Sequence, residues 1–164
     1  MKNSSWLTLL ISISINVLCQ DRTNEFPFKI NPSLVAIQIS NIDSSEKWYK
    51  DNLGFIVEDK KEFPNSGIKV SRLKIEGFDL ELVENEKSIS RNEILKKYPK
   101  GSEIQGFVKL TFITNNIDEA DIYLKKNGVK YLFDLQKSNR LSKENHKWLI
   151  ISDPDGNWIQ LISK

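Results

Sequence analysis

The sequence predicts an α+β protein built from two similar βαβββ halves. Both halves open with a strand-like alternation of apolar and polar residues, at 34–40 and 107–113. A helical pattern that begins after an asparagine follows each opening strand, and three more strand-like runs complete each half. A single half has an unpaired sheet edge. We therefore expect the two halves to pair into one cupped mixed sheet, with the helices on its outer face.

The first half is expected at residues 33–84. Its opening strand alternates, and either Asn41 or Asp43 can cap the helix that follows. Gly54 supplies the left-handed residue that commonly ends a helix. The predicted elements are a strand at 34–40, a helix at 44–52, and strands at 55–59, 68–75 and 78–83.

The second half is expected at residues 105–164, after a polar connector at 85–104. Asn115 or Asn116 can cap its helix, which ends at Asn127-Gly128. The predicted strands lie at 107–113, 129–135, 147–152 and 158–163. The last two are joined by Asp153-Pro-Asp-Gly-Asn157, in which proline and glycine suit the corners of a type I hairpin turn.

Residues 1–19 are typical of a secretory signal peptide. Lys2 precedes an apolar stretch, 6–18, that is too short to span a bilayer, and a polar linker follows at 20–32. Cleavage before Gln20 would leave a mature chain with no cysteine and no transmembrane span, exported to a periplasmic or extracellular compartment. The alternative is lipid attachment at Cys19, although Leu18 is larger than the residue expected before a lipidated cysteine.

The composition argues against a nucleic-acid partner. The chain has 164 residues, with 24 Lys and Arg against 22 Asp and Glu, and no basic stripe with interleaved aromatic residues. The length suits one domain with a workable core.

The order of these segments resembles the vicinal oxygen chelate superfamily, which includes glyoxalases, bleomycin-resistance proteins and extradiol dioxygenases. The resemblance is carried by 40–55, 116–129 and the turn at 153–157, and it extends over nearly all of residues 33–164. It implies two paired βαβββ modules and a homodimer.

The resemblance also indicates where a metal would be held. In the metal enzymes of the superfamily, each module supplies two ligands from the inner face of the cup. The corresponding positions here are Leu34, Glu81, Phe107 and Gln160, with Lys109 as the alternative to Phe107. Only Glu81 is a good ligand for a divalent metal ion. We therefore expect neither a catalytic metal nor another cofactor.

Strand alternation predicts which side chains share the inner face. Residues on the other face, including Val108, are expected to pack against the helices. The inner face offers an aromatic ring among polar groups, which suits a small, flat ligand or the filling of the cup itself. The candidate ligand-binding residues are Gln38, Glu81, Lys109, Thr111, Trp158 and Gln160.

The sequence is compatible with three functions. We favour an exported small-molecule binder without a metal. The second is a lyase, isomerase or dioxygenase with a relocated metal site, or with Glu81 as a weak candidate acid–base residue; we expect instead that Glu81 pairs with Lys109 or is solvated. The third is an exported module that binds other proteins. The single histidine, His146, cannot build a two-histidine iron site.

Overall fold

The computed structural model describes residues 31–138 and 146–164. Residues 33–164 form a compact unit separate from residues 1–32. The predicted signal peptide and most of the predicted linker therefore lie outside the described residues. Within the described ranges, no helix has both the length and the apolar character needed to cross a membrane.

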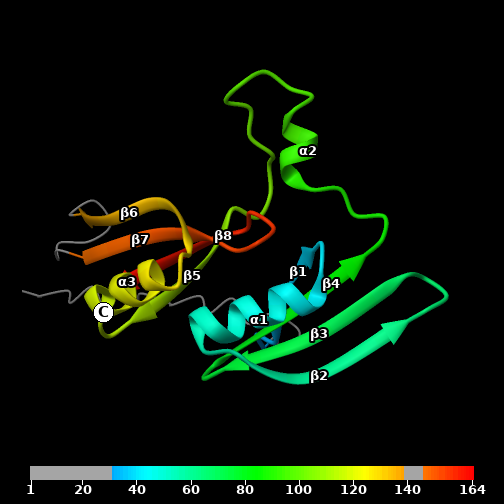
Figure 1. The fold of residues 1–164 in the computed structure, drawn as a ribbon, viewed down its shortest axis with the longest axis horizontal. Coiled ribbons are helices and arrows are strands. Elements are labelled where there is room, and N and C mark those ends of the chain that lie inside the picture. The colour runs from blue at the N-terminus through cyan, green and yellow to red at the C-terminus, as the bar shows by residue number, and fades with distance from the viewer. Residues whose placement is uncertain (1–30, 139–145) are drawn as a thin grey trace, which may run out of the picture. The chain divides into compact units, whose positions relative to one another are not determined.

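The element order is that of two βαβββ modules joined by a connector (Figure 1). The first module contains β1 (Leu34–Ile39), α1 (Ile42–Leu53), β2 (Ile56–Phe63), β3 (Ile68–Ile75) and β4 (Phe78–Asn85). The connector carries α2 (Arg91–Leu95). The second module contains β5 (Lys109–Thr114), α3 (Ile117–Lys126), β6 (Lys130–Ser138), β7 (His146–Ser152) and β8 (Trp158–Ser163).

Each module forms one four-stranded mixed sheet. The strand orders are β1-β4-β3-β2 and β5-β8-β7-β6, so the same topology occurs twice. The first strand of each module lies parallel to its last strand, and the other pairs are antiparallel. The predicted α+β class with paired modules is confirmed.

The helix starts are set by short polar side chains. The side chain of Asn41 accepts a hydrogen bond from the Ser44 nitrogen at 2.9 Å, and that of Asn116 accepts one from the Glu119 nitrogen at 3.2 Å. These bonds satisfy donors that a helix leaves unpaired in its first turn. Asn41 rather than Asp43, and Asn116 rather than Asn115, therefore caps each helix.

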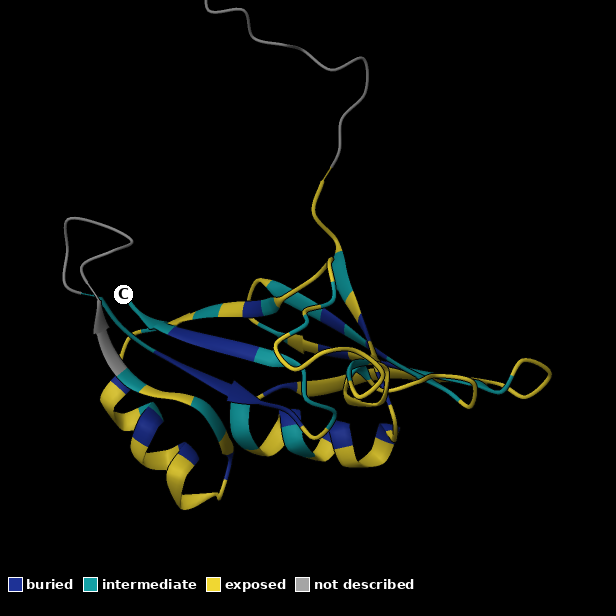
Figure 2. Cartoon of the chain, turned by 90° about the horizontal axis from the view of Figure 1, so that it is seen from above, coloured by how far each residue is buried: buried dark blue, intermediate teal, exposed yellow. Residues whose placement is uncertain are grey.

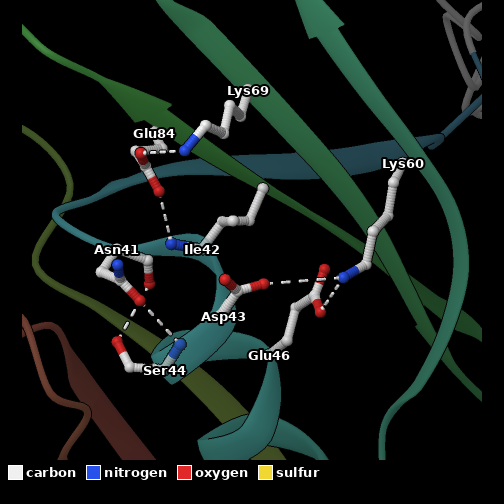
Figure 3. A network of polar contacts seen from close by, with 8 residues as sticks. All are labelled: Asn41, Ile42, Asp43, Ser44, Glu46, Lys60, Lys69 and Glu84. Carbon is white, nitrogen blue, oxygen red and sulfur yellow. Dashed lines mark hydrogen bonds and ion pairs between the residues drawn. The ribbon is translucent and has the colours of Figure 1, made fainter.

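A carboxylate from the sheet also anchors the start of α1 (Figure 3). Glu84 at the end of β4 accepts hydrogen bonds from the Ile42 nitrogen at 2.7 Å and the Lys69 ammonium at 2.9 Å. These donors stabilise the charged form and lower the pKa of Glu84 below its ordinary value of 4.5. The first helix is thereby tied directly to its own sheet.

The core lies between the sheets and the two long helices, which lie on the same side of the strands (Figure 2). We call the opposite face of the sheets the inner face. The core is continuous across the modules, because the Phe55 ring contacts Tyr49 at 5.6 Å and Phe112 of the second module at 6.1 Å. Both contacts are edge-to-face, the geometry that aromatic pairs favour.

The start of β5 differs from the prediction. The strand begins at Lys109, and the side chains of Phe107 and Val108 are 62% and 54% exposed. The pairing with β8 begins where Lys109 lies opposite Trp158, so the two preceding residues have no partner in that strand. The prediction that Val108 packs against the helices is therefore wrong.

Candidate functional site

The turn between β7 and β8 is organised by one buried carboxylate. Asp153 is 4% exposed, and its Oδ1 accepts hydrogen bonds from the nitrogens of Asp155 at 3.0 Å and Asn157 at 2.8 Å. Its Oδ2 accepts a third from the Asn157 amide at 2.8 Å. The Gly156 nitrogen closes the turn onto the Asp153 carbonyl at 3.2 Å, with Gly156 at a φ of 88° that favours glycine. The turn therefore has the glycine-dependent form that the sequence predicted.

The same turn joins the second module to the first. The Tyr49 hydroxyl of α1 donates to Asp153 Oδ2 at 3.0 Å, and both side chains are buried. Asp155 accepts hydrogen bonds from the Ser40 nitrogen at 2.9 Å and the Ser45 hydroxyl at 3.2 Å. Burial raises the pKa of Asp153 more than its hydrogen bonds lower it, and burial also raises the pKa of Tyr49. The Tyr49 hydroxyl therefore keeps its proton and remains a donor.

A cleft opens beside this turn, where the end of β1 meets the residues around the start of β5. Its volume is about 370 Å³, within the range of small-molecule sites. Gln38, Phe107 and Trp158 contribute to its wall, and connector residues 88–91 form another part. The arrangement can enclose a small ligand between the two modules and the connector.

The candidate residues are distributed over three places. Gln38 and Trp158 both line the cleft. Glu81 lies on the inner face of the first sheet, opposite Arg72 of β3, and the two line a small hollow of about 30 Å³. Among the described residues, Glu81 and Lys109 form no ion pair, so the expected partnership is not found.

The other three candidates share the inner face of the second sheet. Lys109 lies opposite Trp158, and Thr111 lies opposite Gln160. Thr111 Oγ1 donates to Gln160 Oε1 at 3.4 Å, and Gln160 is only 4% exposed although the two long helices of the described residues lie on the other side of the strands. Ile150, its neighbour in β7, is also buried. Gln160 and Ile150 are therefore both largely buried on this face.

Three aromatic side chains, which we call the aromatic patch, lie on this face around Ile150. The ring centres of Phe133 and Trp148 are 5.9 Å apart, and those of Phe133 and Trp158 are 6.5 Å apart. Trp158 belongs to both the patch and the cleft wall. Sequence reasoning did not single out Phe133. Its alternation within β6 was the available signal, but the β6–β7 register shifts on both sides of Phe133.

The strand registers clarify the positions where the superfamily's metal enzymes hold their ion. Leu34 lies opposite Asp79, two residues before Glu81, and Lys109 lies opposite Trp158, two residues before Gln160. Lys109, rather than Phe107, is therefore the counterpart of Leu34.

This donor set does not fit a divalent metal ion. An aliphatic side chain and an ammonium group supply no lone pair, and a neutral amide oxygen is a weak ligand beside one carboxylate. In the part of the chain that the structure describes, no three His, Cys, Asp or Glu side chains come together as a metal site. His146 lies at the start of β7, with its Nδ1 3.2 Å from the Ser163 carbonyl oxygen.

Family comparison decides the classification. A model of the glyoxalase/bleomycin resistance protein/dioxygenase superfamily matches residues 32–161. The chain belongs to this superfamily. A search of curated proteins finds no match.

Solved structures of superfamily members share the fold. A glyoxalase family protein from Enterococcus faecalis has a TM-score of 0.68 and 24% identity, over 80% of this chain and 96% of that one. Glyoxalase I from Zea mays has a TM-score of 0.62 and 18% identity, over 79% of this chain and 43% of the maize chain. The trypanothione-dependent glyoxalase I of Leishmania major has a TM-score of 0.59 and 20% identity, over 79% and 83% of the two chains. The predicted superfamily is confirmed.

Proposed function

We propose that this superfamily member is an exported protein that binds a small molecule without a catalytic metal. The observation that carries the proposal is the cleft at the junction of the two modules. It has the volume of a small-molecule site, and it combines the ring of Trp158 with the amide of Gln38. Such a lining suits a ligand with a flat apolar body and a few polar groups.

The position of Glu81 supports binding over acid–base catalysis. Its carboxylate does not line the cleft and instead lies across from Arg72 in the first sheet. A catalytic acid or base must lie within hydrogen-bond reach of the reacting atom. We therefore expect Glu81→Gln to leave ligand affinity unchanged.

The test is a ligand screen followed by titration of Trp158→Phe. For any compound that binds the wild-type protein, the smaller ring should weaken binding about tenfold, as expected for loss of about 1.4 kcal/mol of aromatic contact. Trp48→Phe is the matched control, because Trp48 lies on α1, outside the cleft lining. Equal effects of the two substitutions, or no binding from a broad screen, would contradict the proposal.

Metal content, oligomeric state and the mature N-terminus can be measured on one purified sample. Native mass spectrometry should show a homodimer. It should also show no stoichiometric metal, because the inherited metal-ligand positions carry Leu34, Lys109, Glu81 and Gln160. Stoichiometric zinc, nickel, manganese or iron would overturn the metal-free part. A mature chain beginning at Gln20 would support cleavage and export, whereas a lipid-bearing Cys19 would indicate a membrane-anchored lipoprotein.

A further inference from the structure

We propose that the ligand is a planar aromatic carboxylate that lies on the aromatic patch, with its carboxylate bound by the Gln160 amide and the Lys109 ammonium. This inference rests on the proposed binding function and names the chemical class of the ligand. It extends the site from the cleft, through Trp158, onto the inner face of the second sheet.

The Gln160 side chain has one hydrogen-bonding group in use and one available. Thr111 occupies its oxygen, and among the described residues its nitrogen has no hydrogen-bond partner. Three side-chain atoms of the described residues are both fully buried and unpartnered, and they belong to Glu46, Ser71 and Asp121. The unpartnered Gln160 nitrogen is not one of them, so it retains access to solvent. A side chain that is 4% exposed thus keeps a donor available to a ligand oxygen.

This face also carries a positive charge at Lys109. Lys109 is half-buried, lies diagonally across from Gln160 in the adjacent strand, and makes no ion pair within the described ranges. A cation and an amide donor on neighbouring strands can bind the two oxygens of one carboxylate. The one acidic residue in the described strands of the second sheet, Asp134 of β6, lies 4.0 Å from Lys125 of α3 and therefore belongs to the helical side.

The carboxylates that line the cleft are already engaged with backbone and hydroxyl donors. Asp155 accepts hydrogen bonds from the Ser40 nitrogen and the Ser45 hydroxyl. Glu93 accepts one from the Ser90 nitrogen. The cleft lining also includes one cationic residue, Arg91, but the two carboxylates outnumber it and disfavour an anion there. The ligand carboxylate is therefore assigned to the Lys109 end of the site.

The aromatic patch provides an apolar surface next to these polar groups. Trp158, Phe133 and Trp148 have successive ring centres 6.5 and 5.9 Å apart, and Ile150 is the buried residue between them. Side chains with rigid faces offer stacking area at a small entropy cost. The rings are inclined to one another, by 69° between Phe133 and Trp158 and by 54° between Phe133 and Trp148, so a fused or substituted aromatic ring can contact one ring by its face and the next by its edge.

The amide at position 160 changes the charge that this face can bind. A glutamate there would repel an anionic ligand and would favour a bound cation. The neutral Gln160, beside Lys109, instead makes the second sheet receptive to an anion. The position that serves a metal in other members of the superfamily would here bind the ligand directly.

The experiment compares three probes with the same ring system: 2-naphthoate, 2-naphthylmethanol and 2-naphthylmethylamine. Isothermal titration calorimetry of the full mature protein should show 2-naphthoate binding about tenfold more tightly than either of the others. Gln160→Met and Lys109→Gln should each weaken 2-naphthoate about tenfold and change 2-naphthylmethanol less than twofold. Lys126→Gln, which removes a charge from α3, is the matched control and should change neither probe.

The outcomes separate the two proposals. If all three probes bind equally and with the same dependence on Trp158, small-molecule binding stands and the carboxylate assignment fails. Preferential binding of the amine would also overturn the assignment, since the cleft carboxylates would then dominate. If no probe binds, both the assignment and the proposed binding function are contradicted for planar ligands. Lys109→Gln keeps the test valid if Gln160→Met does not fold, because Lys109 is not in the core.

Discussion

Replacing Tyr49 by phenylalanine should destabilise the protein by about 2 kcal/mol, because a hydrogen bond to a charged acceptor contributes about 1.5–3 kcal/mol. The hydroxyl donates to Asp153 Oδ2 at 3.0 Å inside the junction between the modules. The substitution leaves the ring and its edge-to-face contact with Phe55 in place. Asp153 keeps its three donors from Asp155 and Asn157, so the carboxylate is not orphaned and the cost stays near the lower part of the range.

Urea denaturation followed by tryptophan fluorescence measures this cost. With a slope of about 2 kcal/mol per molar, the midpoint should fall by about 1 M. Tyr98→Phe is the control, because Tyr98 lies in the connector and is 61% exposed. If the Tyr49→Phe midpoint moves no further than that of the control, the turn does not hold the modules together as argued.

Two further substitutions test how the first module is anchored. Glu84→Gln should cost about 1 kcal/mol at pH 7, because the carboxylate binds the helix start at the Ile42 nitrogen. The pKa of Glu84 is lowered on folding, so its contribution is present above its ordinary value of 4.5 and is lost as the pH falls through the lower folded value. Thermal unfolding from pH 7 to pH 3 should therefore show the deficit shrinking, and a constant deficit would refute this reasoning. Phe55→Ala should cost about 3–5 kcal/mol in urea denaturation, because the side chain is 1% exposed; a loss below about 1 kcal/mol would show that the junction repacks.

Local patterns predicted the elements well where local chemistry decides them. Asn41, Asn116 and Gly54 set helix ends through their own side chains or backbone freedom, and each stands where the sequence places it. The start of β5 could not be read in this way, because it depends on where β8 begins. Val108 continues the alternation, yet it has no strand beside it.

The candidate site was predictable only in part, because strand alternation assigns residues to faces but does not say which sheet edges meet. Gln38 and Trp158 lie on different sheets, and it is the junction of the modules that brings them to one cleft. Glu81 lies on the inner face, as predicted, but its strand neighbour is Arg72 and it does not line the cleft. Phe133 was not predicted as a site residue, because the β6–β7 register shifts on both sides of it and alternation along β6 does not assign its face.

The turn at Asp153–Asn157 lies within the residues that match the superfamily, and its contacts in this chain are structural. Both carboxylate oxygens of Asp153 accept hydrogen bonds, from its own turn and from Tyr49. Both carboxylate oxygens of Asp155 accept hydrogen bonds from the first module. These contacts join the two modules independently of what the inner face binds. The turn is therefore explained by the fold alone, and the proposed function rests on the residues of the cleft and of the inner face. Under the proposed function, Gln160 beside Lys109 would bind the ligand at the position where an acidic residue would favour a cation.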